Sequence, residues 1–149
     1  MASADPSRSK PNDEEALIVM RALRLEDFFP EFTGEQCGKI FPRSGVAAYA
    51  PGDYVLEQDE SGRDLFVIVD GSVTVTQSMG SAAAELGTLG PGAVLGEIAL
   101  IREGLRTASA IASVPTRAFR LMYDDMGYVL ENNPMLATHL QNLARERGA

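Results

Sequence analysis

Residues in the middle of the chain combine side-chain types that could bind a phosphorylated ligand. A short helix that begins near Gly96 would leave its first backbone N–H groups unpaired, and such groups bind anions. Arg106 follows Gly96 by ten residues, and its guanidinium offers forked donors that suit a phosphate if the intervening loop folds back. Thr107 and Ala108 leave room for their own backbone N–H groups to point to the same place. This spacing predicts an anion site.

Glu97 would have to bind a different group of the ligand in such a site, because a carboxylate and a phosphate repel each other. A sugar hydroxyl, which donates a hydrogen bond to a carboxylate, would make that position favourable. Glu97 and Arg106 together therefore indicate a nucleotide site with one anionic group. The alternative is an ordinary surface ion pair between the two side chains, which contributes about 0–1 kcal/mol to stability. The residue types alone leave both interpretations open.

The other reactive side chains favour structural roles. His139 stands alone near the polar side of a predicted helix, where a solvated or locally bonded imidazole is expected. Asp124 and Asp125 are adjacent at a predicted helix start, and capping is their simplest role. Cys37, the single cysteine of the chain, is predicted to be a small core residue. One Cys and one His cannot form a four-ligand Cys/His zinc site, so we predict no metal site and no catalytic residue.

Short β-strands must position the predicted site. Between residues 46 and 122, short apolar segments are separated by Pro-Gly, Ser-Gly and Asp-Gly pairs. Asp70-Gly71 is a strong hairpin signal, because glycine tolerates a positive φ. Many short strands at this spacing indicate a β-sandwich or barrel. The predicted strands are 46–50, 53–57, 65–69, 72–78, 85–89, 107–112 and 117–121.

Helical segments are predicted on both sides of these strands, within one domain. Helix signals mark 13–25, 34–40, a short segment that Asp124 or Asp125 could cap, and a last helix that Asn133 could cap. The expected organisation is a disordered tail over 1–12, an N-terminal helical segment over 13–45, β-strands over 46–122 and C-terminal helices over 123–149.

Composition excludes several classes of protein. Thirteen basic and 21 acidic side chains give a net charge of −8, which repels nucleic-acid phosphates, so no direct binding of nucleic acid is expected. The longest apolar stretch near the start, 16–20, is too short for a signal peptide or a membrane span, and no membrane insertion is expected. A single cysteine fits a reducing, cytoplasmic location.

The stretch 95–108 resembles the phosphate-binding cassette of cyclic nucleotide-binding domains. It consists of Leu95, then Gly96-Glu97-Ile98-Ala99-Leu100, a short insert, and Arg106-Thr107-Ala108. Residues 49–59 and 64–75 resemble the early strands and the Asp-Gly hairpin of the same family. The resemblance implies an α+β fold, in which an eight-stranded antiparallel β-roll, jelly-roll-like, is flanked by N-terminal and C-terminal helices.

The resemblance also implies a role for each cassette residue. Arg106 would pair with the cyclic phosphate and Glu97 would accept the ribose 2′-hydroxyl. Backbone groups would complete the cradle at Gly96, Ile98, Ala99, Thr107 and Ala108. In the family the C-terminal helix covers the base, and Leu140 and Leu143 offer apolar area for this role. The alternative is that their stripe, which includes Leu136, simply packs on the roll.

This sequence departs from the family pattern in two places. Leu95 stands where an aromatic residue is frequent, and Leu105 where a proline usually precedes the arginine. The ligand is expected to be cAMP, slightly preferred over cGMP. Thr107 could contact a guanine amino group, but one neutral hydrogen bond contributes about 0.5–1.5 kcal/mol and does not decide between the two.

We therefore expect a stand-alone cyclic nucleotide sensor with no enzymatic activity and no cofactor, whose C-terminal helix moves on binding. Its partner would be an unidentified effector protein, and a homo-oligomer is compatible with the sequence. The alternatives are a regulatory subunit of a separate enzyme or channel, and a degenerate β-roll that contacts proteins and binds no nucleotide. A metal-dependent cupin would need more histidines than the chain has.

Overall fold

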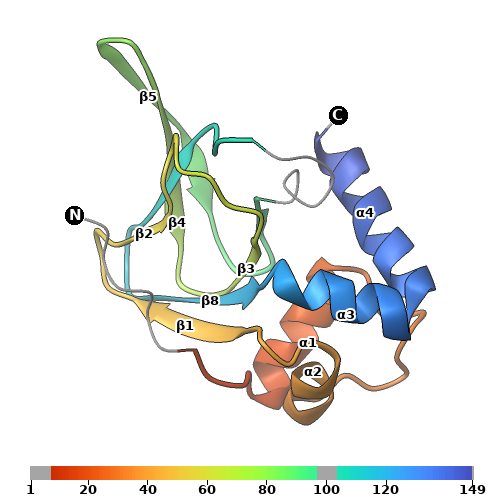
Figure 1. Cartoon of the computed structure of the whole chain (residues 1–149). Helices are drawn as coiled ribbons and strands as arrows, with labels where there is room; N and C mark the ends of the chain where they lie inside the picture. Colours follow the sequence, from red (N-terminus) through yellow and green to blue (C-terminus); the bar gives the residue numbers. More distant parts are fainter. Residues whose placement is uncertain (1–7, 97–103, 149) are drawn as a thin grey trace.

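Strands that fold into two facing sheets form the centre of the molecule, and helices gather at one side of them (Figure 1). The computed structural model describes residues 8–96 and 104–148. Within these residues the strands are β1 Gly45–Tyr49, β2 Tyr54–Leu56, β3 Leu65–Asp70, β4 Val73–Met79, β5 Ala82–Leu89, β6 Val94–Leu95, β7 Ser109–Ala112 and β8 Thr116–Leu121. The helices are α1 Asp13–Ala22, α2 Gly34–Ile40, α3 Asp124–Asn132 and α4 Pro134–Gly148.

The strand order explains why the sheets close over one another. One sheet has the order β1-β8-β3-β6 and the other β2-β7-β4-β5, and all the pairs are antiparallel. Sequence neighbours β1 and β2, or β3 and β4, lie in different sheets. This is the predicted α+β architecture, an eight-stranded antiparallel β-roll flanked by helices.

Strand β3 is buried on both faces, because it contributes to two cores. Leu65, Val67 and Val69 belong to a cluster with side chains of all four helices, which we call the helix-side core. Phe66 and Ile68 belong to a second cluster between the two sheets. Burial on both faces explains why this strand is a continuous apolar run instead of an alternating one.

The hairpin predicted at Asp70-Gly71 joins β3 to β4. Gly71 has φ of 87°, and a Cβ there would overlap the Pro115 carbonyl and lie 2.5 Å from Thr116 Oγ1. Glycine is therefore required both by the backbone conformation and by the close approach of the chain before β8.

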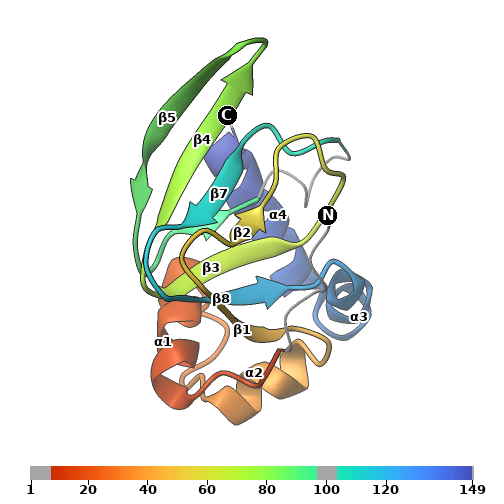
Figure 2. The same ribbon diagram turned by 90° about the vertical axis from the view of Figure 1, so that its left-hand side faces the viewer.

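Strand prediction was least accurate for the exposed strand β5 and for the short strands β6 and β7. β5 begins at Ala82 and is exposed along its whole length, so only part of it was predicted as 85–89. Figure 2 shows the β4–β5 hairpin extending away from α1 and α2. Strand β6, which has only two residues, was not predicted, and β7 begins two residues later than predicted.

The segment 8–12 is part of the fold, so the expectation of a disordered tail over 1–12 is wrong for these residues. Ser9 pairs with Val46 through two backbone hydrogen bonds of 2.9 and 2.7 Å. Asn12 caps α1, accepting from the Glu15 backbone N–H at 2.7 Å, while the Glu15 carboxylate accepts from the Asn12 N–H at 3.1 Å. Residues 1–7 lie outside the described residues.

Asp125 does not cap α3, contrary to the sequence prediction. The residue is 1% exposed, and its carboxylate accepts from the Arg43 backbone N–H at 3.1 Å and from Ser44 Oγ at 2.6 Å. Ser44 Oγ in turn accepts from the Met122 N–H at 2.9 Å. The carboxylate therefore accepts hydrogen bonds from the segment before β1. Helix α3 begins after Tyr123 without a side-chain capping bond.

The last helix begins as predicted, with the Asn133 side chain accepting from the Leu136 N–H at 3.2 Å. His139 is half-buried and bonded: its Nε2 lies 2.9 Å from the accepting Leu23 carbonyl oxygen, and its ring lies 5.0 Å from that of Phe28. Cys37 is 1% exposed in the helix-side core, as predicted. Among the described residues, no helix is both long and apolar enough to cross a membrane.

Candidate functional site

The backbone around Arg106 is fixed by the loop between β2 and β3. The Arg106 N–H donates to the Glu60 carbonyl at 2.8 Å, and the Arg106 carbonyl accepts from the Asp59 N–H at 2.9 Å. The preceding residue, Leu105, forms an isolated antiparallel bridge with Ser61. These contacts place Arg106 beside the loop before β7 starts.

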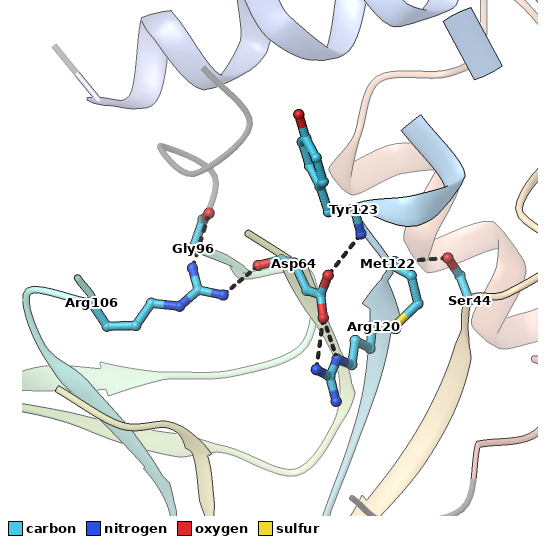
Figure 3. Close-up of polar contacts among 7 residues, drawn as sticks. All are labelled: Ser44, Asp64, Gly96, Arg106, Arg120, Met122 and Tyr123. Atoms are coloured by element: carbon cyan, nitrogen blue, oxygen red, sulfur yellow. Dashed lines mark hydrogen bonds and ion pairs between the residues drawn. The ribbon is translucent and has the colours of Figure 1, made fainter. Parts of the chain in front are cut away.

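The guanidinium of Arg106 lies between two backbone carbonyls, as Figure 3 shows. Its Nη2 donates to the Asp64 carbonyl at 2.8 Å, and its Nη1 donates to the Gly96 carbonyl at 3.4 Å. Gly96 and Arg106, ten residues apart, therefore lie together, as the anion-site hypothesis required. Glu97, Ile98 and Ala99 lie outside the described residues.

Two glycines make room for this arginine. Gly96 has φ of 77°, and a Cβ there would lie 2.6 Å from Arg106 Nη1. A Cβ on Gly62 would lie 3.1 Å from Arg106 Nη2. Sequence reasoning placed Gly96 in the site but treated Ser61-Gly62 only as a turn. Nothing in the local sequence of Gly62 indicates that a side chain 44 residues away packs against it.

The electrostatics of the half-buried Arg106 favour an added anion. Burial lowers the pKa of its guanidinium, and the charge of Arg120 lowers it further, whereas the charges of Asp64 and Glu60 raise it, with a net lowering. Among residues 8–96 and 104–148, no carboxylate forms an ion pair with Arg106, whose side-chain partners there are the two carbonyls. The hydrogen-bond acceptors of the guanidinium within the described residues are neutral carbonyls, and a phosphate would compensate its charge.

The residues next to Arg106 differ in exposure. Thr107 is exposed, and its carbonyl accepts from Gln77 Nε2 at 2.9 Å. Ala108 is half-buried, and Leu105 is 60% exposed. Leu95, where the family frequently has an aromatic residue, is 7% exposed and belongs to the core between the sheets. The leucine that replaces the frequent aromatic residue therefore packs in this core.

Leu140 and Leu143 do not form a free apolar surface for a base. They are 0% and 2% exposed and lie in the helix-side core, together with Leu136. The same core contains side chains of α1 and β3, such as Val19 and Val67. In this arrangement both residues pack in the core, as the alternative interpretation of the stripe expected. They could cover a ligand only if α4 left this core.

Sequence reasoning missed Asp64, which belongs to the site through its backbone and to α3 through its side chain. Its carboxylate forms an ion pair with Arg120, with Oδ2 2.7 Å from Nη2, and accepts from the Tyr123 N–H at 2.7 Å. In the sequence this aspartate only marks the start of an apolar strand. Its role depends on β8 lying beside β3, which the strand pairing decides.

The two facing four-stranded sheets form the jelly-roll domain that the resemblance of the cassette implied. A family model described as "Cyclic nucleotide-binding domain" matches residues 46–133. The chain belongs to this family.

Relatives in sequence include both channels and a bacterial receptor. The chain is 32% identical over 99 residues to the potassium/sodium hyperpolarization-activated cyclic nucleotide-gated channel 4 of Homo sapiens, which is 66% of this chain and 8% of the channel. It is 31% identical over 100 residues to the Cyclic AMP receptor protein of Thermus thermophilus, which is 66% of this chain and 46% of the receptor. The chain thus spans less than half the length of either relative.

Solved structures share the fold over most of the chain. A cyclic nucleotide-binding domain from Methylobacillus flagellatus KT superposes with a TM-score of 0.75 at 23% identity, covering 95% of this chain and 84% of that one. The Catabolite Activator Protein of Thermus thermophilus superposes with a TM-score of 0.68 at 27% identity, covering 85% of this chain and 57% of that one. A structure described under "A cyclic-GMP-dependent signalling pathway regulates bacterial phytopathogenesis" superposes with a TM-score of 0.61 at 26% identity, covering 78% of this chain and 93% of that one.

Proposed function

We propose that this chain is a cytoplasmic cyclic nucleotide sensor without catalytic activity, which binds cAMP in preference to cGMP. The cyclic phosphate binds Arg106 and the ribose 2′-hydroxyl binds Glu97. Backbone groups of Gly96, Ile98, Ala99, Thr107 and Ala108 complete the cradle. Membership of the family supports this assignment, and the geometry around Arg106 supports its phosphate-binding end.

The observation that carries the proposal is the half-buried guanidinium of Arg106, held by the carbonyls of Gly96 and Asp64. Its charge is destabilised by burial, so an entering anion gains electrostatic energy without displacing a carboxylate described in the structure. A hydrogen bond to a charged group contributes about 1.5–3 kcal/mol.

The preference for cAMP is supported by the relative named as a cyclic AMP receptor protein. A similar structure is described under a cyclic-GMP-dependent pathway, so cGMP is the necessary comparison. Thr107 is exposed next to Arg106, where a hydroxyl is available to a guanine amino group. One such bond changes affinity severalfold at most.

We further propose that binding is transmitted by a change in the position of α4. Such a population shift requires that the ligand binds the two positions of the helix with different affinity. The signal would pass to an effector protein.

Calorimetric titration of cAMP and cGMP into the chain tests the proposal. In Arg106→Lys we expect cAMP affinity to fall about tenfold to a hundredfold, because lysine cannot reproduce the forked contact. Arg21→Lys, on an exposed position of α1, makes the same change away from the site and should bind like the parent. Absence of binding of both nucleotides at high micromolar concentration would contradict the proposal and favour a protein-interaction role.

A further inference from the structure

Asp64 lies between the Arg106 guanidinium and the start of α3, and it contacts both. Its backbone carbonyl accepts from Arg106 Nη2 at 2.8 Å. Its carboxylate accepts from Arg120 Nε through Oδ2 and from the Tyr123 backbone N–H through Oδ1, each at 2.7 Å. Figure 3 shows these two sets of contacts on opposite sides of one residue. A single residue therefore joins the candidate anion site to the residue that precedes α3.

The Asp64 carboxylate is held in one orientation. Its Oδ2 lies 2.7 Å from Arg120 Nη2 as well as from Nε, so the guanidinium engages it with two nitrogens. The Arg120 and Asp64 side chains are 20% and 14% exposed, so water competes little with this ion pair. Because both carboxylate oxygens are engaged, the side chain cannot rotate without losing a bond.

Tyr123 is fixed to the segment 63–64 in two ways. Its backbone N–H donates to Asp64, and its ring lies 4.0 Å from the guanidinium carbon of Arg63. Tyr123 occupies the N-cap position of α3 and forms no side-chain capping bond. Asp64 therefore supplies a carboxylate at the entrance to this helix, where the helix dipole favours negative charge.

We propose that Asp64 is a positioning residue that couples Arg106 to the first turn of α3. The inference rests on the proposed function, in which a phosphate binds Arg106. A phosphate would draw on guanidinium donors that lie against the Asp64 and Gly96 carbonyls, so residue 64 shifts when the site fills. Its carboxylate holds Arg120 and Tyr123, so α3 shifts with it. By linkage, the position of α3 then changes the affinity of the site.

The first arm of the test follows α3 during nucleotide binding. cAMP is titrated into the 15N-labelled full chain, and the amide signals of Tyr123 and Gly127 are recorded by NMR. In the parent both signals move with occupancy. Asp64→Asn keeps the backbone carbonyl and loses the charge, so at matched nucleotide occupancy we expect α3 signals that hardly move. Asp70→Asn, at the other end of β3, makes the same charge change and should respond like the parent.

The second arm needs no nucleotide. Arg106→Gln removes the guanidinium from the Asp64 carbonyl, and in the ligand-free parent we expect it to shift the Tyr123 and Gly127 signals. In the Asp64→Asn background the same change should leave these signals in place. A merely structural role for Asp64 would not link the two substitutions in this way.

The outcomes separate the inference from the proposed function. α3 signals that follow nucleotide equally in the parent and in Asp64→Asn would overturn the coupling, as would an Arg106→Gln change with no effect on α3. If no nucleotide binds the parent, the proposed function fails, and the second arm still decides the coupling. If Asp64→Asn does not fold, Arg120→Lys replaces it: loss of the forked contact should weaken the α3 response while the Tyr123 N–H stays bonded.

Discussion

At residue 96 the absence of a side chain decides how close the Arg106 guanidinium lies to the backbone. Gly96→Ala would place a Cβ 2.6 Å from Nη1 and would strain a backbone with φ of 77°. The strain costs about 1–2 kcal/mol in stability, and displacement of Arg106 should lower cAMP affinity at least about tenfold. Denaturation and calorimetry measure the two effects separately.

Gly92→Ala is the control for this substitution. Gly92 has φ of 90°, but nothing lies within 4 Å of a Cβ built there. It should lose similar stability and keep the parent's affinity. Equal losses of affinity in the two variants would show that contact with Arg106 is not the cause.

An ion pair between the buried Glu15 and the half-buried Arg117 makes stability depend on pH. Burial raises the pKa of Glu15, but hydrogen bonds from Arg117 and the Asn12 N–H, with the charge of Arg117, lower it below the usual 4.5. Because the folded pKa is the lower one, the pair stabilises the protein above about pH 4.5, and this stability is lost as pH falls through the folded pKa. Glu15→Gln should cost about 1–3 kcal/mol at pH 7, and urea denaturation should show the difference shrinking below pH 4.5. A difference that is constant with pH would contradict this role.

At the scale of elements, Asp125 fastens α3 to the segment before β1. Asp125→Ala would leave the Arg43 N–H and Ser44 Oγ without this acceptor, so the free energy of unfolding should fall by about 3 kcal/mol in urea denaturation. Asp124→Ala removes the exposed neighbouring carboxylate and should cost less than about 1 kcal/mol. Similar losses in both variants would indicate that helix-dipole effects explain Asp125.

The elements also show where sequence patterns succeed. The apolar run of β3 and the Asp70-Gly71 turn were predicted because burial and backbone conformation act on neighbouring residues. β5 is exposed along its length, so apolar periodicity could not mark its start. The prediction for Asp125 was wrong because a local capping pattern contains no information on a donor 82 residues away.

At the scale of the whole molecule, α4 is part of the helix-side core. Leu140→Ala removes a side chain that is 0% exposed and should lower stability by about 2–5 kcal/mol. We expect the folded protein to lose less than about threefold in cAMP affinity, because Leu140 packs in the core and not over the site. Leu130→Ala, at a position that is 58% exposed, is the control and should change neither quantity. A large loss of affinity with little loss of stability would restore the base-covering role.

The sequence by itself determined that short strands form a sandwich or barrel with helices on either side, because strand alternation, turn glycines and helix caps are encoded by adjacent residues. The resemblance of residues 95–108 to a family cassette added the eight-stranded β-roll. The sequence also indicated Gly96 and Arg106 as partners in an anion site. Only the tertiary structure decided that carbonyls of Gly96 and Asp64 hold the guanidinium, and that Asp64 also holds α3. These contacts depend on which strands lie side by side, and that pairing comes from packing of the whole core.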